Sequence, residues 1–142
     1  KATIFDLDNT LYDENIYYLK VFKKFSDLYN LNFTIFEKAF TDKFRLSADD
    51  IFSDILTKLN FYSVSNQKKL FELYKSINCN IKMYNNAYKI LNYLKSRNIK
   101  IVIITNGTVD AQRNKVKLLN ITKYVDNNDL GKISDDEKAL EV

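Results

Sequence analysis

Two short apolar runs in the chain end in polar residues. Residues 2–6 read Ala-Thr-Ile-Phe-Asp, and residues 100–105 read Lys-Ile-Val-Ile-Ile-Thr and are followed by Asn-Gly. Short runs rich in apolar and β-branched residues predict buried strands of a parallel sheet. In an open α/β sheet, ligands bind outside the carboxyl ends of the strands. We therefore expect a binding site where these two runs end.

The segment between the two runs has apolar side chains at helical spacing. One amphipathic stretch covers residues 17–29, and three later stretches each follow a residue that can cap a helix: Thr34, Ser47 and Ser65. The side chains of such residues accept hydrogen bonds from the first N–H groups of a helix. The pattern predicts a subdomain of about four helices.

Two further helices flank the second apolar run. Apolar residues at helical spacing predict a helix over residues 86–97 that ends at Asn98, and Thr108 is expected to cap a helix that runs to about Leu119 and is closed by Asn120. The chain has no proline and only 2 glycines. We therefore expect asparagine to adopt the left-handed conformation that usually closes a helix at glycine.

The order of these elements is strand, helical insert, helix, strand and helix, which predicts an α/β fold. Residues 1–14 and 81–142 would form the core, and residues 15–80 would form a helical subdomain inserted after the first strand. A chain of 142 residues, 46% of them hydrophobic, is long enough to bury such a core.

Charge and hydrophobicity argue against nucleic acid or a membrane as partner. The net charge is +4, and the lysines are dispersed along the helical patterns instead of forming a basic stripe. No stretch approaches the ~18 apolar residues that a membrane span requires, and the first apolar run is too short for a signal peptide. We expect a cytoplasmic protein, and the sequence leaves its oligomeric state open.

The chain contains no histidine and a single cysteine, Cys79. Chemistry that depends on histidine, including Ser-His-Asp hydrolysis and histidine-ligated zinc, is therefore excluded for these residues. The cysteine cannot form an internal disulfide, and it lacks the usual histidine partner of a catalytic thiol. Any catalysis by these residues must use carboxylates, lysines, hydroxyls and a hard metal ion.

Two carboxylates lie two positions apart at the end of the first apolar run, in Asp6-Leu7-Asp8-Asn9-Thr10. If the strand continues, side chains at positions i and i+2 share a face, so both acids can converge on one site. A divalent cation holds two nearby carboxylates ionised, and magnesium prefers oxygen ligands that include phosphate oxygens. The segment therefore predicts a magnesium and phosphate site. An ordinary Asx turn at the end of a strand is the alternative interpretation.

Residues 5–12, Phe-Asp-Leu-Asp-Asn-Thr-Leu-Tyr, resemble the first motif, Asp-x-Asp-x-Thr, of the haloacid dehalogenase-like superfamily. Residues 103–107, Ile-Ile-Thr-Asn-Gly, resemble its second motif, and the insert between them has the size and helical character of the first-position cap of that superfamily. The resemblance implies a Rossmann-like parallel sheet as the catalytic core, partly missing at the C-terminus, with residues 15–80 as a helical cap.

The resemblance also implies a role for each matched residue. Asp6 would attack phosphorus and form an aspartyl-phosphate, and Asp8 would protonate the leaving oxygen and then activate the hydrolytic water. Thr105 and the backbone N–H groups of Leu7 and Asn106 would bind the phosphoryl oxygens. Magnesium (Mg²⁺) would bind a carboxylate oxygen of Asp6 and the backbone carbonyl of Asp8.

The third and fourth motifs of the superfamily match less closely. Lys132 is the candidate for the third-motif lysine, which binds the phosphoryl group, although the usual proline is absent. The fourth motif, a strand that ends in a further metal-binding aspartate, has no match, and Asp135 and Asp136 instead suit the first turn of a helix. Because the sequence opens at Lys1 instead of Met, we expect it to represent part of a longer protein.

These matches predict a magnesium-dependent phosphatase for a small phosphorylated metabolite, such as a nucleoside monophosphate or a sugar phosphate. Asp8 favours phosphoryl transfer, because dehalogenases that displace halide do not need a leaving-group acid. A phosphotransferase or mutase with the same chemistry, and a non-catalytic binding module on the same fold, are the alternatives. The insert aromatics Tyr17, Tyr18, Phe22 and Phe25 could line the substrate cavity, but aromatic residues at helical spacing are more often core.

Overall fold

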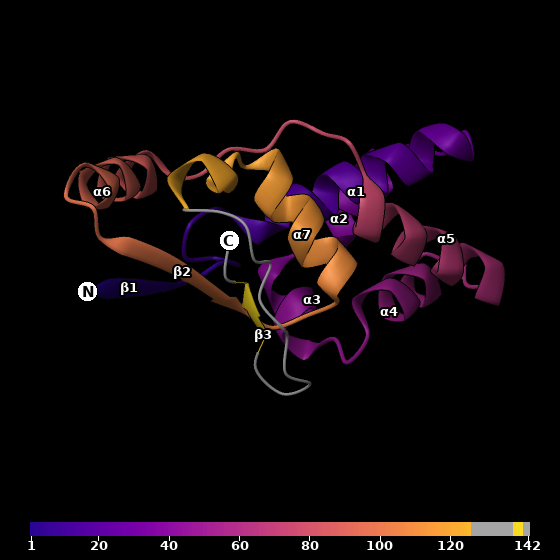
Figure 1. Ribbon diagram of the computed structural model, residues 1–142. Helices are drawn as coiled ribbons and strands as arrows, with labels where there is room; N and C mark the ends of the chain where they lie inside the picture. The colour runs from indigo at the N-terminus through magenta and orange to yellow at the C-terminus, as the bar shows by residue number, and fades with distance from the viewer. Residues whose placement is uncertain (126–137, 141–142) are drawn as a thin grey trace. The chain divides into compact units, whose positions relative to one another are not determined.

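The computed structural model describes residues 1–125 and 138–140 (Figure 1). In chain order, the elements are β1 (Ala2–Asp6), α1 (Glu14–Leu28), α2 (Thr34–Ala39), α3 (Asp42–Ser47), α4 (Ile51–Lys58), α5 (Val64–Ser76), α6 (Asn85–Ser96), β2 (Lys100–Thr105), α7 (Val109–Leu118), the 3₁₀ helix η1 (Ile121–Tyr124) and β3 (Lys138–Leu140). Within the described ranges, no helix has the length and apolar character needed to cross a membrane.

The sheet brings the two predicted strands together. β1 and β2 are parallel neighbours, with Ala2 opposite Lys100 and Asp6 opposite Ile104. β3 is antiparallel to β2, so the strand order is β1-β2-β3. The predicted α/β fold is confirmed, and both strands have the bounds of the apolar runs. Since β1 and β2 are parallel, their carboxyl ends lie at the same edge of the sheet.

The chain divides into two compact units. The sheet unit comprises Lys1–Glu14 and Asn78–Val142, and the helical unit comprises Asn15–Ile77. The assignment of a catalytic core to residues 1–14 and 81–142, and of a cap to residues 15–80, stays a prediction.

Two helices of the sheet unit, α6 and α7, differ in the side chains that they bury. α6 lies against β2, and its buried residues are all apolar: Ala87, Leu91 and Leu94. The buried face of α7 instead carries two long polar side chains, Gln112 and Lys115, beside Ala111 and Val116. A buried lysine needs partners for its charge, because moving an unpaired charge out of water is costly. α7 must therefore lie where polar groups opposite it can pair with Lys115.

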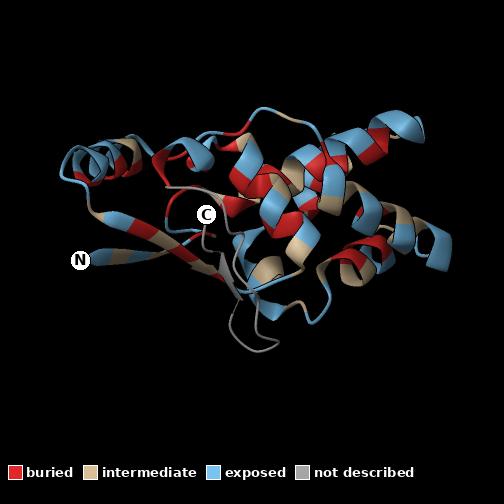
Figure 2. Ribbon diagram, viewed as in Figure 1, coloured by how far each residue is buried: buried red, intermediate tan, exposed pale blue. Residues whose placement is uncertain are grey.

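The helical unit is built around aromatic side chains. The rings of Phe22 and Phe36 stack with their centroids 5.3 Å apart. Tyr17, Phe22 and Phe25 are fully buried, whereas Tyr18 is half-buried. Each long helix carries both buried (red) and exposed (pale blue) stretches (Figure 2). The interpretation of these aromatics as core is confirmed for Tyr17, Phe22 and Phe25. Aromatic rings each bury a large apolar surface, so these three contribute strongly to the core of this unit.

The helix starts of the helical unit differ from the prediction. Ser47 is the last residue of α3, and Asp50 caps α4 instead, because its carboxylate accepts two N–H groups of the first turn at 3.1 Å. Ser65 lies inside α5, whose cap is Ser63. Thr34 is the first residue of α2 and does not cap it. Several neighbouring residues in this unit have side chains that can cap a helix. The sequence pattern therefore predicts each helix start only to within a few residues.

Asparagine occupies the backbone positions at which glycine is usual. Asn9, Asn30, Asn60, Asn98 and Asn120 all have φ between 54° and 60°. Asparagine tolerates this left-handed region better than other residues with a Cβ atom. Asn98 follows α6 and Asn120 follows α7, so the prediction of asparagine as the helix-closing residue is confirmed.

Candidate functional site

The site begins where β1 and β2 end. Asp6 is the last residue of β1, and Thr105 is the last residue of β2. Asp6 is opposite Ile104, the residue before Thr105, in the parallel register. The side chain of Asp6 is exposed, whereas Thr105 is buried. The structure thus brings an accessible carboxylate and a buried hydroxyl to the same edge of the sheet.

The loop after β1 orients the Asp6 carboxylate. Its Oδ1 accepts the backbone N–H of Leu7 at 2.8 Å, and its Oδ2 accepts the hydroxyl of Thr10 at 3.3 Å. Both donors come from the same short loop, so the orientation of Asp6 depends on the path of the loop. A carboxylate that is exposed and oriented in this way is accessible to a substrate.

A turn, and not a continued strand, places Asp8. The strand ends at Asp6, and the carbonyl of Leu7 accepts the N–H groups of Thr10 at 3.3 Å and Leu11 at 3.1 Å. Asn9 enables this turn with its left-handed backbone, φ 58°. The expectation that Asp6 and Asp8 share one face of a strand required β1 to continue through Asp8, and β1 ends at Asp6. The turn determines where Asp8 lies.

Three side chains bind the Asp8 carboxylate. Oδ1 accepts the hydroxyl of Tyr12 at 2.5 Å and the ammonium of Lys115 at 3.0 Å. Oδ2 accepts Nε2 of Gln112 at 2.8 Å. Both oxygens of Asp8 are therefore held, one of them by an ion pair. Hydrogen bonds that involve an ionised group are the stronger kind.

Gln112 links Asp8 to the end of β2. Its Nε2 also lies 2.5 Å from the hydroxyl oxygen of Thr105 and 3.3 Å from the carbonyl of Asn106. An amide nitrogen only donates, so the Thr105 oxygen accepts in this contact. The Thr105 hydroxyl therefore keeps its own proton to donate to another acceptor.

Lys115 is a fully buried cation between two carboxylates. Its side chain has 0% exposure, and its ammonium lies 3.0 Å from Oδ1 of Asp8 and 3.1 Å from Oε2 of Glu14. Burial opposes ionisation of Asp8. The charge of Lys115 and the hydrogen bonds that Tyr12 and Gln112 donate outweigh that effect and hold the pKa of Asp8 below its ordinary value. In the folded protein, Asp8 is therefore ionised at neutral pH.

The pattern of one protein family, haloacid dehalogenase-like hydrolase, matches residues 3–129 of the chain. The chain belongs to this family. The resemblance on which the sequence interpretation rested is confirmed, and the chain is a member of a hydrolase family.

One relative of this haloacid dehalogenase-like chain carries the name putative pyrophosphatase PpaX and comes from Clostridium perfringens (strain 13 / Type A). The two are 30% identical over 132 residues, which are 89% of this chain and 58% of PpaX. The chain thus spans less than two thirds of the length of that relative.

Two solved structures share the fold. One is described as a dehalogenase, with a TM-score of 0.51 and 18% identity over 89% of this chain and 60% of that one. The other is described as the putative HAD-hydrolase YfnB from Bacillus subtilis bound to magnesium, with a TM-score of 0.55 and 16% identity over 86% of this chain and 60% of YfnB. At these identities the likeness concerns the fold alone.

The structure shows where several of the residues that the family resemblance assigned lie. It brings Asp6, Asp8 and Thr105 to one region of the sheet unit. The N–H of Leu7, assigned to phosphoryl oxygens, donates to Oδ1 of Asp6, the residue assigned as the nucleophile. Lys132, the candidate for the third motif, lies outside the described residues. The catalytic and binding roles of all these residues stay predictions.

Sequence reasoning missed four side chains at this haloacid dehalogenase-like site: Tyr12, Glu14, Gln112 and Lys115. A signal was present on α7, because Gln112 and Lys115 lie at helical spacing on the same face as Ala111 and Val116. A long polar side chain on an otherwise apolar helix face indicates a buried polar partner. For Tyr12 and Glu14 the sequence carried no comparable signal.

The oxygen atoms of the site are suited to magnesium. Among residues 1–125 and 138–140, no three His, Cys, Asp or Glu side chains are close enough together to hold a metal ion. Magnesium, however, commonly binds one or two carboxylates and takes its remaining ligands from water and substrate phosphate. The exposed carboxylate of Asp6 and the backbone carbonyl of Asp8 are hard oxygen donors of this kind. Asp6 and Asp8 therefore stay the predicted metal ligands.

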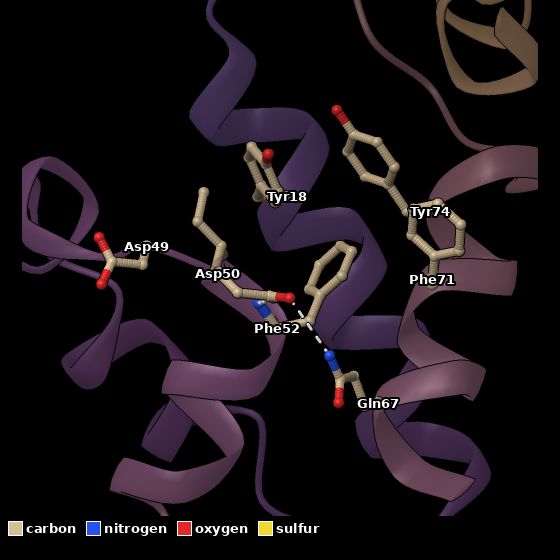
Figure 3. Close-up of a pocket in the computed structure, with 8 residues that line it drawn as sticks. Tyr18, Asp49, Asp50, Phe52, Gln67, Phe71 and Tyr74 are labelled. Atoms are coloured by element: carbon tan, nitrogen blue, oxygen red, sulfur yellow. Dashed lines mark hydrogen bonds between the residues drawn. The ribbon is translucent and has the colours of Figure 1, made fainter. Parts of the chain in front are cut away.

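The helical unit has a pocket of about 290 Å³ with aromatic walls (Figure 3). Tyr18, Phe52, Phe71 and Tyr74 line it, together with Asp49, Asp50, Ile51 and Gln67. The amide of Gln67 donates to Asp50 at 3.2 Å, which ties α5 to the start of α4. Tyr18, one of the aromatics that could line the substrate cavity, lines this pocket of the helical unit, and a role in substrate binding stays a prediction.

Proposed function

We propose that this haloacid dehalogenase-like chain is the catalytic part of a magnesium-dependent phosphohydrolase that works through an aspartyl-phosphate. One observation carries the proposal: Asp6 and Thr105 end neighbouring parallel strands, and the amide of Gln112 joins Thr105 to Asp8. An accessible carboxylate, a hydroxyl and a second carboxylate are the groups that a two-step phosphoryl transfer needs.

Asp6 is the proposed nucleophile. A carboxylate oxygen of Asp6 forms a bond to phosphorus while the bond from phosphorus to the leaving oxygen breaks, and water then hydrolyses the resulting acyl phosphate. The donors from Leu7 and Thr10 hold the carboxylate in one orientation and leave its side chain exposed. Orientation of a reacting group lowers the entropic part of the barrier.

Asp8 is the proposed acid and base. Because its pKa lies below the ordinary value, Asp8 is a carboxylate at neutral pH and is ready to take a proton from the hydrolytic water. To act as an acid in the first step, Asp8 must gain a proton. The negative charge of a phosphate bound nearby favours this, because a like charge raises the pKa of a carboxyl.

Thr105 and the backbone N–H groups of Leu7 and Asn106 are the proposed phosphoryl ligands, with Lys132 as a further cation. The Thr105 hydroxyl accepts from Gln112 and so has its own proton to donate. Bound at the Asp6 carboxylate and the Asp8 carbonyl, magnesium would neutralise charge on the phosphoryl oxygens. Donors and charges placed where negative charge develops stabilise the transition state.

The proposed substrates are small phosphorylated metabolites, namely nucleoside monophosphates and sugar phosphates. The name of PpaX adds inorganic pyrophosphate, in which the leaving group is phosphate instead of an alcohol. Asp8 fits both, since each leaving oxygen gains from protonation. The proposal also includes a cytoplasmic location and a small molecule, not nucleic acid or a membrane, as partner.

Phosphate release from a panel of these compounds tests the proposal. The natural protein is compared, with and without magnesium, to its Asp6→Asn variant and to Asp27→Asn as a matched control, because Asp27 is an exposed residue of a surface ion pair. We expect release that needs magnesium, survives Asp27→Asn and falls to the background rate in Asp6→Asn.

Release that Asp6→Asn leaves intact would contradict the proposal, and transfer of the phosphoryl group to a second substrate would indicate the phosphotransferase alternative. Binding of these compounds without release would indicate the binding-module alternative.

A further inference from the structure

α7 holds Asp8 through two side chains that are one helical turn apart. Gln112 binds Oδ2 of Asp8 at 2.8 Å, and Lys115 binds Oδ1 at 3.0 Å. Positions i and i+3 share a helix face, so a rigid helix presents both donors together. Each donor approaches a different oxygen, and together they prevent the carboxylate from rotating.

We propose that Gln112 and Lys115 are positioning residues that orient the Asp8 carboxylate for proton transfer to the leaving group. The inference rests on the proposed function, because it gives these residues a part in the same reaction. Proton transfer requires the acid to lie within hydrogen-bond reach of the leaving oxygen, so its rate depends on the orientation of the carboxylate. Asp8 needs such external support because it lies in a turn and not on a strand.

Gln112 also relates Asp8 to the phosphoryl site. The same Nε2 atom contacts Asp8, the Thr105 hydroxyl and the carbonyl of Asn106. Asp8 therefore has a defined position relative to the end of β2, where the phosphoryl group is proposed to bind. A displaced Gln112 would change the distance between the acid and the leaving oxygen without removing either.

Gly107 has no side chain, and Gln112 occupies the space in which a side chain at position 107 would lie. A Cβ atom at this position would lie 3.3 Å from Cδ of Gln112, tighter than an ordinary contact, and Gly107 has φ +136°. Residues with a side chain rarely adopt that backbone conformation. The chain between β2 and α7 is thus shaped so that the amide of Gln112 reaches Asp8 and Thr105.

Lys115 is itself held in place by a second acid. Its ammonium lies 3.1 Å from Oε2 of Glu14, and Glu14 is 8% exposed. Burying one cation and two carboxylates is costly, and an apolar side chain would fill the same volume more cheaply. A positioning role accounts for the retained charge: the ion pairs fix the direction from which Lys115 approaches Asp8.

Two substrates that differ in their leaving group separate positioning from a structural effect. p-Nitrophenyl phosphate releases a stable phenolate that needs little help from an acid, whereas an alkyl phosphate such as glycerol 2-phosphate releases an alkoxide unless a proton arrives. The ratio of kcat/KM for these two substrates reports the first phosphoryl transfer, and a smaller fraction of folded protein lowers both values equally. The variants are Gln112→Met and Lys115→Met, with Lys117→Met as the control, since Lys117 is exposed on the same helix.

We expect Gln112→Met and Lys115→Met to lower kcat/KM for glycerol 2-phosphate by about 10²-fold, near the lower end of what a positioned acid contributes. The value for p-nitrophenyl phosphate should change much less, and Lys117→Met should change neither. Asp8→Asn should shift the ratio in the same direction. If Lys115→Met does not fold, Gln112→Met decides the question.

An equal fall for both substrates in Gln112→Met would overturn the positioning role while leaving the proposed function intact. If Asp8→Asn leaves the ratio unchanged, Asp8 is not the acid, and the positioning role fails with it. The same conclusion follows if the natural protein releases phosphate from neither substrate.

Discussion

The two units of the molecule differ in what they bury. The helical unit has a core of aromatic and aliphatic side chains, and its buried polar residue among those described is Ser26. Among its described residues, the sheet unit buries four that are polar or charged: Glu14, Thr105, Gln112 and Lys115. Each of the four has a partner at hydrogen-bond distance, whereas the Ser26 hydroxyl has none within the described part of the chain.

This difference indicates two ways of specifying a fold. An apolar interior gains stability from buried area and packed volume, and neither depends strongly on direction. A buried polar network gains little net stability, but it tolerates only those arrangements that satisfy each group. The helical unit should therefore respond to lost volume, and the sheet unit to lost partners even when volume is kept.

Phe22→Ala should produce the largest effect. Phe22 is fully buried and contacts three other phenylalanine rings, so its truncation leaves a cavity. We expect the free energy of unfolding to fall by about 3–5 kcal/mol. Urea denaturation measures this, with Tyr62→Ala as the control, since Tyr62 is 50% exposed. Equal losses in the two variants would contradict an aromatic core centred on Phe22.

Lys115→Met should cost about 3 kcal/mol although it nearly preserves volume, because it leaves two carboxylates without their shared cation. The double variant Lys115→Met/Glu14→Gln should recover part of that loss, because it also removes one of the stranded charges. Lys117→Met serves as the control, and thermal unfolding provides the measurement. If Lys115→Met is as stable as the natural protein, polar pairing does not distinguish the sheet unit.

The stability of the metal-free protein should depend on pH through Asp8. Its pKa in the folded protein lies below the ordinary value of 3.8, so the folded state takes up this proton less readily than the unfolded state. The resulting stabilisation is fully present well above pH 3.8 and is lost as the pH falls through the lower, folded-state pKa. Urea midpoints between neutral and acid pH should show a shallower acid decline in Asp8→Asn than in Asp27→Asn. Identical declines would indicate that Asp8 is not stabilised as the anion.

Ser26→Ala should have the smallest effect, in the opposite direction. The Ser26 hydroxyl is buried without a hydrogen-bond partner among the described residues, and alanine also favours a helix interior more than serine does. We expect the free energy of unfolding to rise by about 1 kcal/mol. A fall in stability would show that the hydroxyl has a partner, and would weaken the contrast between the two units.

Much of the fold follows from local patterns that the sequence carries openly. The bounds of β1 and β2 match the two apolar runs, because strand formation there depends on short, contiguous apolar segments. The left-handed residues Asn98 and Asn120 follow from the need to close helices in a chain with 2 glycines. The choice between neighbouring caps, such as Ser63 and Ser65, depends on backbone geometry that the pattern does not specify.

The family, the two strands and the residues of the first two motifs could be predicted from the sequence, since each of these is encoded in contiguous residues. Tertiary structure alone decided the surroundings of Asp8. Gln112 and Lys115 lie more than a hundred residues further along the chain, and helical spacing shows that they share a face but not what that face meets. Parallel pairing of β1 and β2 brings α7 to the loop after β1, so the partners of Asp8 exist only once the sheet has formed.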